Sequence, residues 1–386
     1  MIEVNRPWGR RQRHLNMTML ITGMGTAVPA GTVSQTAAYE ATHQLCCDSD
    51  EQRRVMEMIY QGAGVNQRST VLLEEAVAIQ DVVDGFYAPR SHDDDRGPST
   101  RARMEKFEEC SLALAMESCE TALAHADQDV SEITHLVTVS CSGFHAPGFD
   151  IGLIQHLGLS PETQRTHVGF MGCHGSFNGL RVAKSYVEAD PKAVVLMCSV
   201  ELCSLHHHYG WSTEKVIANA LFADGSAAVV CRADKTDTNP LQAKFKLIRN
   251  GSYLMPDTLN AMSWRIGDHG FEMTLSQKVP GLIEKHLESW MKSFLAKEGL
   301  TIGDVKQWAI HPGGPRILDS CLAALDISSD DVAPAREILA QYGNMSSATI
   351  LFLLNRLQAE TRRGPVVAVG FGPGLTIETM LLNSDV

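Results

Sequence analysis

The sequence predicts an α/β protein built from two similar halves, and three observations lead to this class. Strand-like and helix-like segments alternate along much of the 386 residues. About 37 residues separate Leu136 from Cys173, and about 36 separate Trp308 from Asn344, so a strand-to-helix spacing repeats. From each helix start, the next strand ends about 26 residues further on. We therefore expect duplicated βαβ halves.

The first half contains β-branched apolar runs that are typical of buried strands, together with two long amphipathic segments. Ser99 is a suitable N-cap for a helix that runs to about Ala126 with apolar residues on one face. The other predicted elements are strands at Met19–Gly23, Thr134–Ser140 and Thr166–Phe170, a helix from His174 to about Ala189, and strands at Ala193–Ser199 and Ser226–Cys231.

The second half repeats this order after a polar stretch. Charged residues, Asn and Pro between Arg232 and Pro240 separate two strand runs, so we place a boundary there and divide the chain into 1–235 and 236–386. The Asp-rich stretch Ser91–Ser99 is predicted to be a solvated loop. The predicted elements of the second half are a strand at Trp308–Ile310, a helix from Asn344 to about Glu360, and strands at Val366–Gly370 and Leu375–Leu382.

Charge and composition exclude several classes of function. The formal charge is −12, which argues against binding nucleic acid over a broad face. No apolar run reaches the length of a membrane span, and no apolar segment follows the arginines of the first 16 residues as in a secretory signal. Ten cysteines without a C-x-x-C pair predict a reduced, cytoplasmic protein without a zinc site. His206, His207 and His208 are adjacent and cannot converge on one metal from regular structure, so no metal and no role are assigned to them.

Cys173 is the first candidate for chemistry. It lies in the segment Phe170–Ser176, between a predicted strand and a predicted helix. The positive end of a helix dipole lowers the pKa of a thiol there, and Gly172 and Gly175 leave room for a substrate. A buried structural cysteine is the alternative. Met171 stands where a hydrolase elbow needs glycine, which disfavours a hydrolase.

His311 and Asn344 are the second and third candidates. His311 ends a predicted strand in the segment HPGGP, and Asn344 precedes an apolar helix in YGNMSS. A hydrogen-bonded turn histidine and a helix N-cap are the structural alternatives. Together with Cys173 they make a specific proposal. An imidazole can pair with the thiolate, and an imidazole and an amide can both donate to one enolate oxygen. Decarboxylative Claisen condensation of thioesters requires these groups.

Several motifs extend this pattern over nearly the whole chain, which resembles the type III polyketide synthases of the chalcone/stilbene synthase family, in particular bacterial-type members. HPGGP, YGNMSS and GFGPGLT occur in this order and are highly specific. Ketoacyl-ACP synthase III shares the Cys–His–Asn logic but not this set. The matching segments are Leu20–Pro29, Thr134–Gly148, Gly172–Arg181, Leu221–Ala227, Val279–Leu282, Trp308–Asp319, Tyr342–Ser347 and Gly370–Thr379.

The resemblance implies a thiolase fold, layered α-β-α-β-α, in a homodimer. It implies that Cys173 carries the starter and the growing chain as a thioester. His311 and Asn344 would bind malonyl-CoA and stabilise the enolate, and His311 would keep Cys173 ionised. Phe222 matches a gating aromatic residue, and a second gating Phe of plant members is replaced by Met273. The substrates would be CoA thioesters, with no acyl carrier protein and no permanently bound cofactor.

Two further departures concern the substrate. Ala146, Ser142 and Cys203 are small where some bacterial members open a tunnel for a long acyl chain, and small packing residues are the alternative. The cations that grip CoA phosphates in plant members fall on apolar or glycine positions here. The neighbouring arginines that could replace them are Arg53, Arg54 and Arg68.

The expected function is therefore iterative, carrier-free extension of an acyl-CoA with malonyl-CoA, followed by cyclisation to an alkylpyrone or alkylresorcinol-type product. A malonyl-primed tetrahydroxynaphthalene-type synthase is the main alternative within the family. A ketoacyl-ACP synthase III-like enzyme and a non-catalytic acyl-binding homologue are alternatives outside it.

Overall fold

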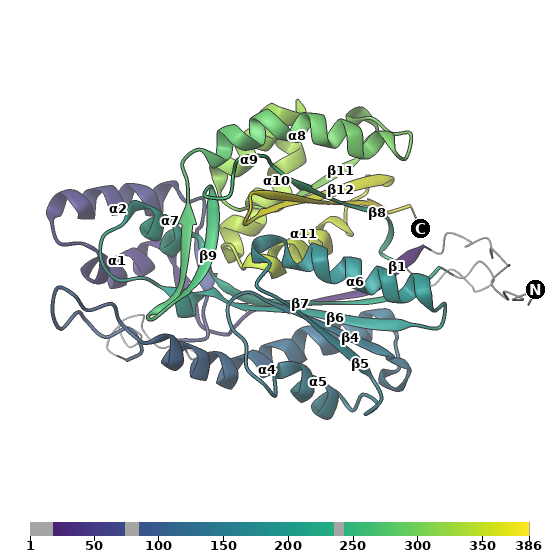
Figure 1. Ribbon diagram of the computed structural model, residues 1–386, viewed down its shortest axis with the longest axis horizontal. Helices are drawn as coiled ribbons and strands as arrows, with labels where there is room; N and C mark the ends of the chain where they lie inside the picture. The colour runs from purple at the N-terminus through teal and green to yellow at the C-terminus, as the bar shows by residue number, and fades with distance from the viewer. Residues whose placement is uncertain (1–17, 74–84, 235–242, 386) are drawn as a thin grey trace, which may run out of the picture.

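Five layers of helices and sheets make up the computed structural model, which describes residues 18–73, 85–234 and 243–385 (Figure 1). Helices α6 (Gly175–Ala189) and α11 (Thr349–Leu357) form the central layer, with strands on both sides of them. This α-β-α-β-α arrangement confirms the predicted fold class. The outer layers are α4 (Thr100–Ala126) and α5 (Phe149–Leu157) on one side, and α8 (Val279–Ala296), α9 (Pro315–Leu325) and α10 (Ser329–Tyr342) on the other.

The strands form one hydrogen-bonded sheet of nine strands in the order β11-β12-β13-β8-β1-β7-β6-β4-β5. Strand β1 pairs with β8 over Met19–Ile21 only, so the two ends of the sheet diverge and enclose α6 and α11. The strands are β1 (Met19–Ala27), β4 (His135–Ser140), β5 (Gln164–Gly169), β6 (Val194–Leu202), β7 (Asp224–Ala233), β8 (Phe245–Leu254), β11 (Gln307–Ile310), β12 (Pro365–Gly372) and β13 (Thr376–Asn383).

The two halves share one topology. In the first, β4 runs parallel to β6, α6 lies between them in sequence, and β7 follows antiparallel to β6. In the second, β11 runs parallel to β12, α11 lies between them, and β13 follows antiparallel to β12. The spacing repeat therefore reflects a repeated strand–helix–strand–strand unit. The predicted boundary around 235–240 and the arginines of the N-terminal segment lie outside the described residues.

The core lies between the diverging parts of the sheet. One face of α6 is buried through Phe177, Leu180 and Ala183, and α11 is buried on almost every side, from Thr349 to Leu354. Each fully buried Leu, Ile or Phe side chain contributes roughly 1.5–3 kcal/mol to folding. The central helices are thus rigidly held, and both halves direct the loops before these helices toward one end of the molecule.

Of the predicted boundaries that differ from the structure, two lie next to a candidate residue. Strand β5 ends at Gly169, not Phe170, because Phe170 adopts the left-handed conformation, with φ of 60°. The helix predicted from Asn344 begins only at Thr349, after a 3₁₀ turn at Ser346–Ala348, and ends at Leu357. In both places the backbone leaves regular structure next to a candidate residue, Cys173 in the first case and Asn344 in the second.

Several elements were not predicted, and they cover the end of the molecule where the central helices begin. The unpredicted elements there are α1 (Gln35–Cys46), α2 (Asp50–Gly62), α7 (Thr213–Leu221), the short strands β2 (Thr32–Ser34) and β3 (Gln67–Ser69), and the hairpin of β9 (Met262–Gly267) and β10 (Gly270–Leu275). Strand β8 and helices α5 and α8–α10, which lie elsewhere, were not predicted either.

Among the helices in the described ranges, none is long and apolar enough to cross a bilayer.

Candidate active site

Cys173 lies in a 3₁₀ turn, Gly172–His174, directly before α6. Gly172 has φ of 75°, and a Cβ atom on it would come within 2.5 Å of the Pro373 ring, so only glycine fits. The backbone N–H of Gly172 donates to the Cys141 sulfur at 3.0 Å. These contacts hold the Cys173 thiol at the N-terminal end of a buried helix, as the sequence predicted.

Asn344 is held beside the predicted gate, Phe222. Its backbone N–H donates to Leu221 O at 2.8 Å, and its carbonyl accepts from Ala223 N–H at 3.0 Å, which makes a parallel bridge between Phe222 and Asn344. Its side-chain Oδ1 accepts from the Ser346 N–H at 2.9 Å. The Nδ2 hydrogens are left to donate, and the Asn344 side chain acts to lower the pKa of the nearby Cys173 thiol. The amide therefore acts as an oriented donor and not as an N-cap.

His311 directly follows β11 and is 1 % exposed. Its backbone N–H donates to Val369 O at 2.9 Å, which fixes its place beside β12. Within the described ranges, neither ring nitrogen has a hydrogen-bond partner. A buried imidazole without hydrogen-bond partners lowers the stability of the fold by about 1–3 kcal/mol. Such a group typically forms its hydrogen bonds with a ligand.

The charge states differ from the predicted thiolate–imidazolium pair. Burial raises the pKa of Cys173 to about 11, although hydrogen bonds from Ser346 and Asn344 act to lower it. Burial, and then the field of His174, lower the pKa of His311 to about 3. The structure without substrate therefore favours a neutral thiol and a neutral imidazole. A pair of charges would have to form when the substrate changes the solvation of the site.

A cavity with about 370 Å³ of space free of protein atoms opens at Cys173. Four of the five residues predicted to shape the cavity line it: Ser142, Cys203, Phe222 and Met273. Ala146, the fifth, is exposed on the loop after β4 and lies outside this lining. The structure therefore gives no support to a tunnel past Ala146 within one chain. Gly172, Pro373, Met262 and Trp264 complete much of the remaining wall.

Sequence reasoning missed Glu201, a fully buried carboxylate in the wall of this cavity. It accepts hydrogen bonds from the backbone N–H groups of Cys141 and Ser142 and from the hydroxyls of Ser142 (2.6 Å) and Ser347. Burial nevertheless raises its pKa. A single carboxylate inside the apolar run Val194–Leu202 was the available signal.

Ser346 was also missed as a separate contributor, and its role is testable. Because its hydrogen bond lowers the pKa of Cys173, Ser346→Ala should raise that pKa further and reduce the thiolate fraction at any pH below it. We expect alkylation by iodoacetamide at pH 8 to slow by about 3- to 10-fold, since one pKa unit is tenfold in thiolate. Ser185→Ala, at the far end of α6, is the matched control. An unchanged alkylation rate in Ser346→Ala would contradict this role.

A second cavity opens at the surface beside the gate, between α2, α7 and the start of α9. It is largely apolar, and Arg316 is the only Lys or Arg among its lining residues in the described ranges. Leu221, the neighbour of Phe222, and Gly313, two residues after His311, both line it. This cavity therefore approaches the catalytic cavity from outside.

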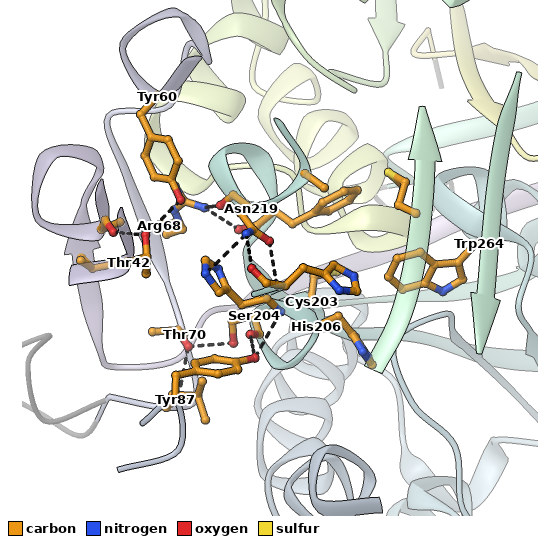
Figure 2. A pocket seen from close by; sticks show the side chains of 18 residues that line it. Thr42, Tyr60, Arg68, Thr70, Tyr87, Cys203, Ser204, His206, Asn219 and Trp264 are labelled. Carbon is orange, nitrogen blue, oxygen red and sulfur yellow. Dashed lines mark hydrogen bonds between the residues drawn. The ribbon is translucent and has the colours of Figure 1, made fainter. Parts of the chain in front are cut away.

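Among the arginines predicted for CoA phosphates, Arg68 requires a correction (Figure 2). Arg68 is buried, and its guanidinium donates to the carbonyls of Asn219 (2.7 Å), Ala220 (3.0 Å) and Phe222 (3.0 Å), so it stabilises the loop that carries the gate. Arg53 and Arg54 are exposed on α2 but do not line the surface cavity. Their part in binding CoA phosphates stays a prediction.

Comparisons with known proteins show the family to which the chain belongs. Family models of the chalcone and stilbene synthases match residues 8–235, as the N-terminal domain, and 246–385, as the C-terminal domain. The chain belongs to the chalcone and stilbene synthase family. It is a type III polyketide synthase, an acyltransferase-type condensing enzyme that forms carbon–carbon bonds.

Relatives of this type III polyketide synthase are named after different products. An alpha-pyrone synthesis polyketide synthase-like protein, Pks18 of Mycobacterium tuberculosis, is 32% identical over 94% of this chain and 91% of its own length. A 1,3,6,8-tetrahydroxynaphthalene synthase of Streptomyces peucetius is 30% identical over 97% and 96%. The crystal structure of PKS-I from the brown alga Ectocarpus siliculosus superposes with a TM-score of 0.85 and 30% identity. The match covers 95% of this synthase and 98% of the algal chain.

Proposed function

We propose that this type III polyketide synthase loads an acyl-CoA starter on Cys173, extends it with malonyl-CoA without an acyl carrier protein, and releases an alkylpyrone or alkylresorcinol-type product. The observation that carries the proposal is the Cys173 thiol, which lines a cavity at the start of a helix and whose pKa the Asn344 side chain acts to lower. The alpha-pyrone name of a relative with 32% identity supports the class of product.

The chemistry follows from the groups in place. The Cys173 sulfur attacks the thioester carbonyl of the starter, forming acyl-Cys173 and releasing CoA thiol. Malonyl-CoA then loses CO₂, and the negative charge moves to its thioester oxygen. The Asn344 amide and a His311 N–H are proposed to donate to that oxygen. The enolate carbon attacks acyl-Cys173, which yields a β-ketoacyl-CoA and frees the sulfur.

The unpartnered His311 ring supports its part in this scheme. An imidazole buried without partners regains a hydrogen bond when a thioester oxygen arrives. Because burial keeps this ring neutral, it can offer one N–H as a donor without carrying a charge into the cavity. The neutral resting pair becomes charged only when the thiol transfers its proton, which we place at starter loading.

The CoA part is proposed to occupy the surface cavity, with Arg316 at a phosphate group. Arg316→Ala should raise KM for malonyl-CoA by about 3- to 10-fold and leave kcat nearly unchanged, because a phosphate contact acts equally in ground and transition states. Steady-state kinetics measure both constants. Arg101→Ala, on the exposed face of α4, is the control with no expected change. A fall in kcat with constant KM would contradict the assignment.

A homodimer is proposed because two large apolar side chains are exposed beside the site. Phe144 is 50 % exposed on the loop that follows Ser142, and Met171 is 37 % exposed two residues before Cys173. Such side chains next to a catalytic loop favour a protein interface. Light scattering of the purified chain measures the mass in solution.

The function is tested by mass analysis of products from a series of acyl-CoA starters with malonyl-CoA. Alkylpyrones or alkylresorcinols are expected, and a purified chain that extends no starter would refute the proposal. Malonyl-CoA alone distinguishes the alternative suggested by the tetrahydroxynaphthalene synthase relative, because only a malonyl-primed enzyme then forms an aromatic product.

A further inference from the structure

His174 directly follows Cys173 in the chain, and the chemistry above does not use it. Its side chain is buried and extends from the 3₁₀ turn toward the second half of the molecule. The ring lies against Gly372, where an added Cβ atom would come within 2.2 Å of the imidazole Cδ2. Only glycine leaves room for the ring at the end of β12, so the two halves fit together at this point.

Two hydrogen bonds join the His174 ring to two different elements. Nδ1 lies 3.0 Å from Asn178 Oδ1, one turn further along α6. Nε2 lies 2.6 Å from the hydroxyl oxygen of Thr376, the first residue of β13. The Asn178 amide nitrogen faces Glu378 at 3.5 Å, so the amide oxygen faces the ring and Nδ1 carries the proton. Nε2 then accepts from the Thr376 hydroxyl.

The His174 ring keeps both hydrogen bonds whether it is neutral or charged. Burial lowers its pKa, while the Glu378 carboxylate, which forms an ion pair with Arg181, acts in the opposite direction. If the ring gains a proton, Nε2–H donates to the Thr376 oxygen. The Thr376 hydroxyl then donates to Pro373 O, which lies 3.1 Å away. The link between α6 and β13 therefore does not depend on the charge of the ring.

Strand β12 is a platform that His174 and His311 share. The backbone N–H of His311 donates to Val369 O within β12 at 2.9 Å. The His174 ring packs on Gly372, the last residue of the same strand. A side chain next to Cys173 thus relates the nucleophile of the first half to the strand that holds the catalytic imidazole of the second half.

We propose that His174 is a positioning residue, whose two hydrogen bonds hold the turn that carries Cys173 in a fixed place relative to β12 and therefore to His311. This inference rests on the proposed function and deepens it, because the enolate must meet an acyl group carried on Cys173. Decarboxylation needs the enolate donors His311 and Asn344, whereas condensation also needs the sulfur in the correct position. A misplacement of about 1 Å at a reacting pair can lower the rate roughly 10²-fold.

The ratio of CO₂ released to carbon–carbon bonds formed measures this positioning. An enolate that does not reach the acyl group takes up a proton and leaves as acetyl-CoA, so CO₂ is released without extension. Thr376→Val removes the hydroxyl partner with little change of shape, and His174→Phe keeps an aromatic ring without its hydrogen bonds. We expect each variant to raise the ratio about 3- to 10-fold and to lower kcat for polyketide, at an unchanged KM for malonyl-CoA. Trapped CO₂ and mass analysis of products supply the two quantities.

Three further variants make the test specific to the bond between His174 and Thr376. The double variant His174→Phe/Thr376→Val should be no worse than the more impaired single variant, because both single variants lack the same bond. His174→Gln places an amide oxygen within reach of the Thr376 hydroxyl and should restore most of the lost coupling. His156→Phe is the control and should leave the ratio unchanged, since this exposed ring contacts Gly152 O of its own helix, α5.

Two outcomes would overturn the assignment. A ratio that stays at the parent value in active Thr376→Val and His174→Phe enzymes would show that these hydrogen bonds do not position the sulfur. CO₂ release and polyketide that fall in parallel, together with a lower melting temperature, would assign His174 to the stability of the fold alone. If the unaltered enzyme forms no polyketide from an acyl-CoA and malonyl-CoA, the proposed function fails instead.

Discussion

Cys173→Ala is expected to abolish condensation while slow decarboxylation of malonyl-CoA remains. The substitution removes the sulfur that lines the catalytic cavity, and therefore the atom proposed to carry the starter. Loss of a covalent nucleophile lowers turnover on the order of 10⁶-fold. The enolate donors His311 and Asn344 stay in place, because the backbone contacts that hold them do not involve the thiol. Mass analysis measures polyketide, and trapped CO₂ measures decarboxylation.

The control is Cys110→Ala, which removes a partly buried thiol from α4 and should leave both activities intact. A Cys173→Ala enzyme that makes full-length polyketide would refute the covalent mechanism. Loss of decarboxylation together with condensation would instead indicate that the thiol supports malonyl-CoA binding, which the scheme does not require.

Asn344→Ala is expected to lower decarboxylation by about 10²–10³-fold, the usual cost of removing one donor to a developing oxyanion. The backbone bridge between Asn344 and Phe222 does not depend on the side chain, so the gate should remain in place. Making the change in the Cys173→Ala background separates enolate stabilisation from loading, since that background has no nucleophile. Trapped CO₂ is again the measurement.

Loading provides the check on this second variant. With Cys173 present, Asn344→Ala should still form acyl-Cys173, which intact mass detects. Asn355→Ala on α11 is the matched control and should affect neither step. Decarboxylation that persists at the parent rate would show that the amide is not an enolate donor, and the case for His311 alone would then have to be examined by its own substitution.

The spacing between segments was sufficient to predict the duplicated fold. Strand β4 with α6 and strand β11 with α11 recur because the same buried strand–helix–strand unit needs the same chain length twice. Apolar runs identify such strands reliably when both faces are covered. The helices α1, α2 and α7 escaped prediction because they pack mainly against one another and against the hairpin strand β10, and not against the nine-stranded sheet.

The residues of the candidate site were also predictable only in part. Cys173, His311 and Asn344 follow or precede predictable elements, and specific motifs surround them. Glu201 and Ser346 were not recognised, since a lone carboxylate in a strand acquires meaning only from the backbone N–H groups that surround it. The expectation for Arg68 failed because sequence proximity to a binding helix does not reveal that the guanidinium turns inward to three carbonyls.

The sequence by itself determined the family, the layered α/β fold and the three candidate residues for the reaction, because these depend on local patterns and motif order. Only the tertiary structure decided the charge states of Cys173 and His311 and the space behind Cys203. Both depend on burial and on which distant segments meet: desolvation sets the first, and the packing of α1, α2 and α7 behind Cys203 sets the second. Burial and packing depend on many residues that are distant in sequence, so no short segment of the chain reveals them.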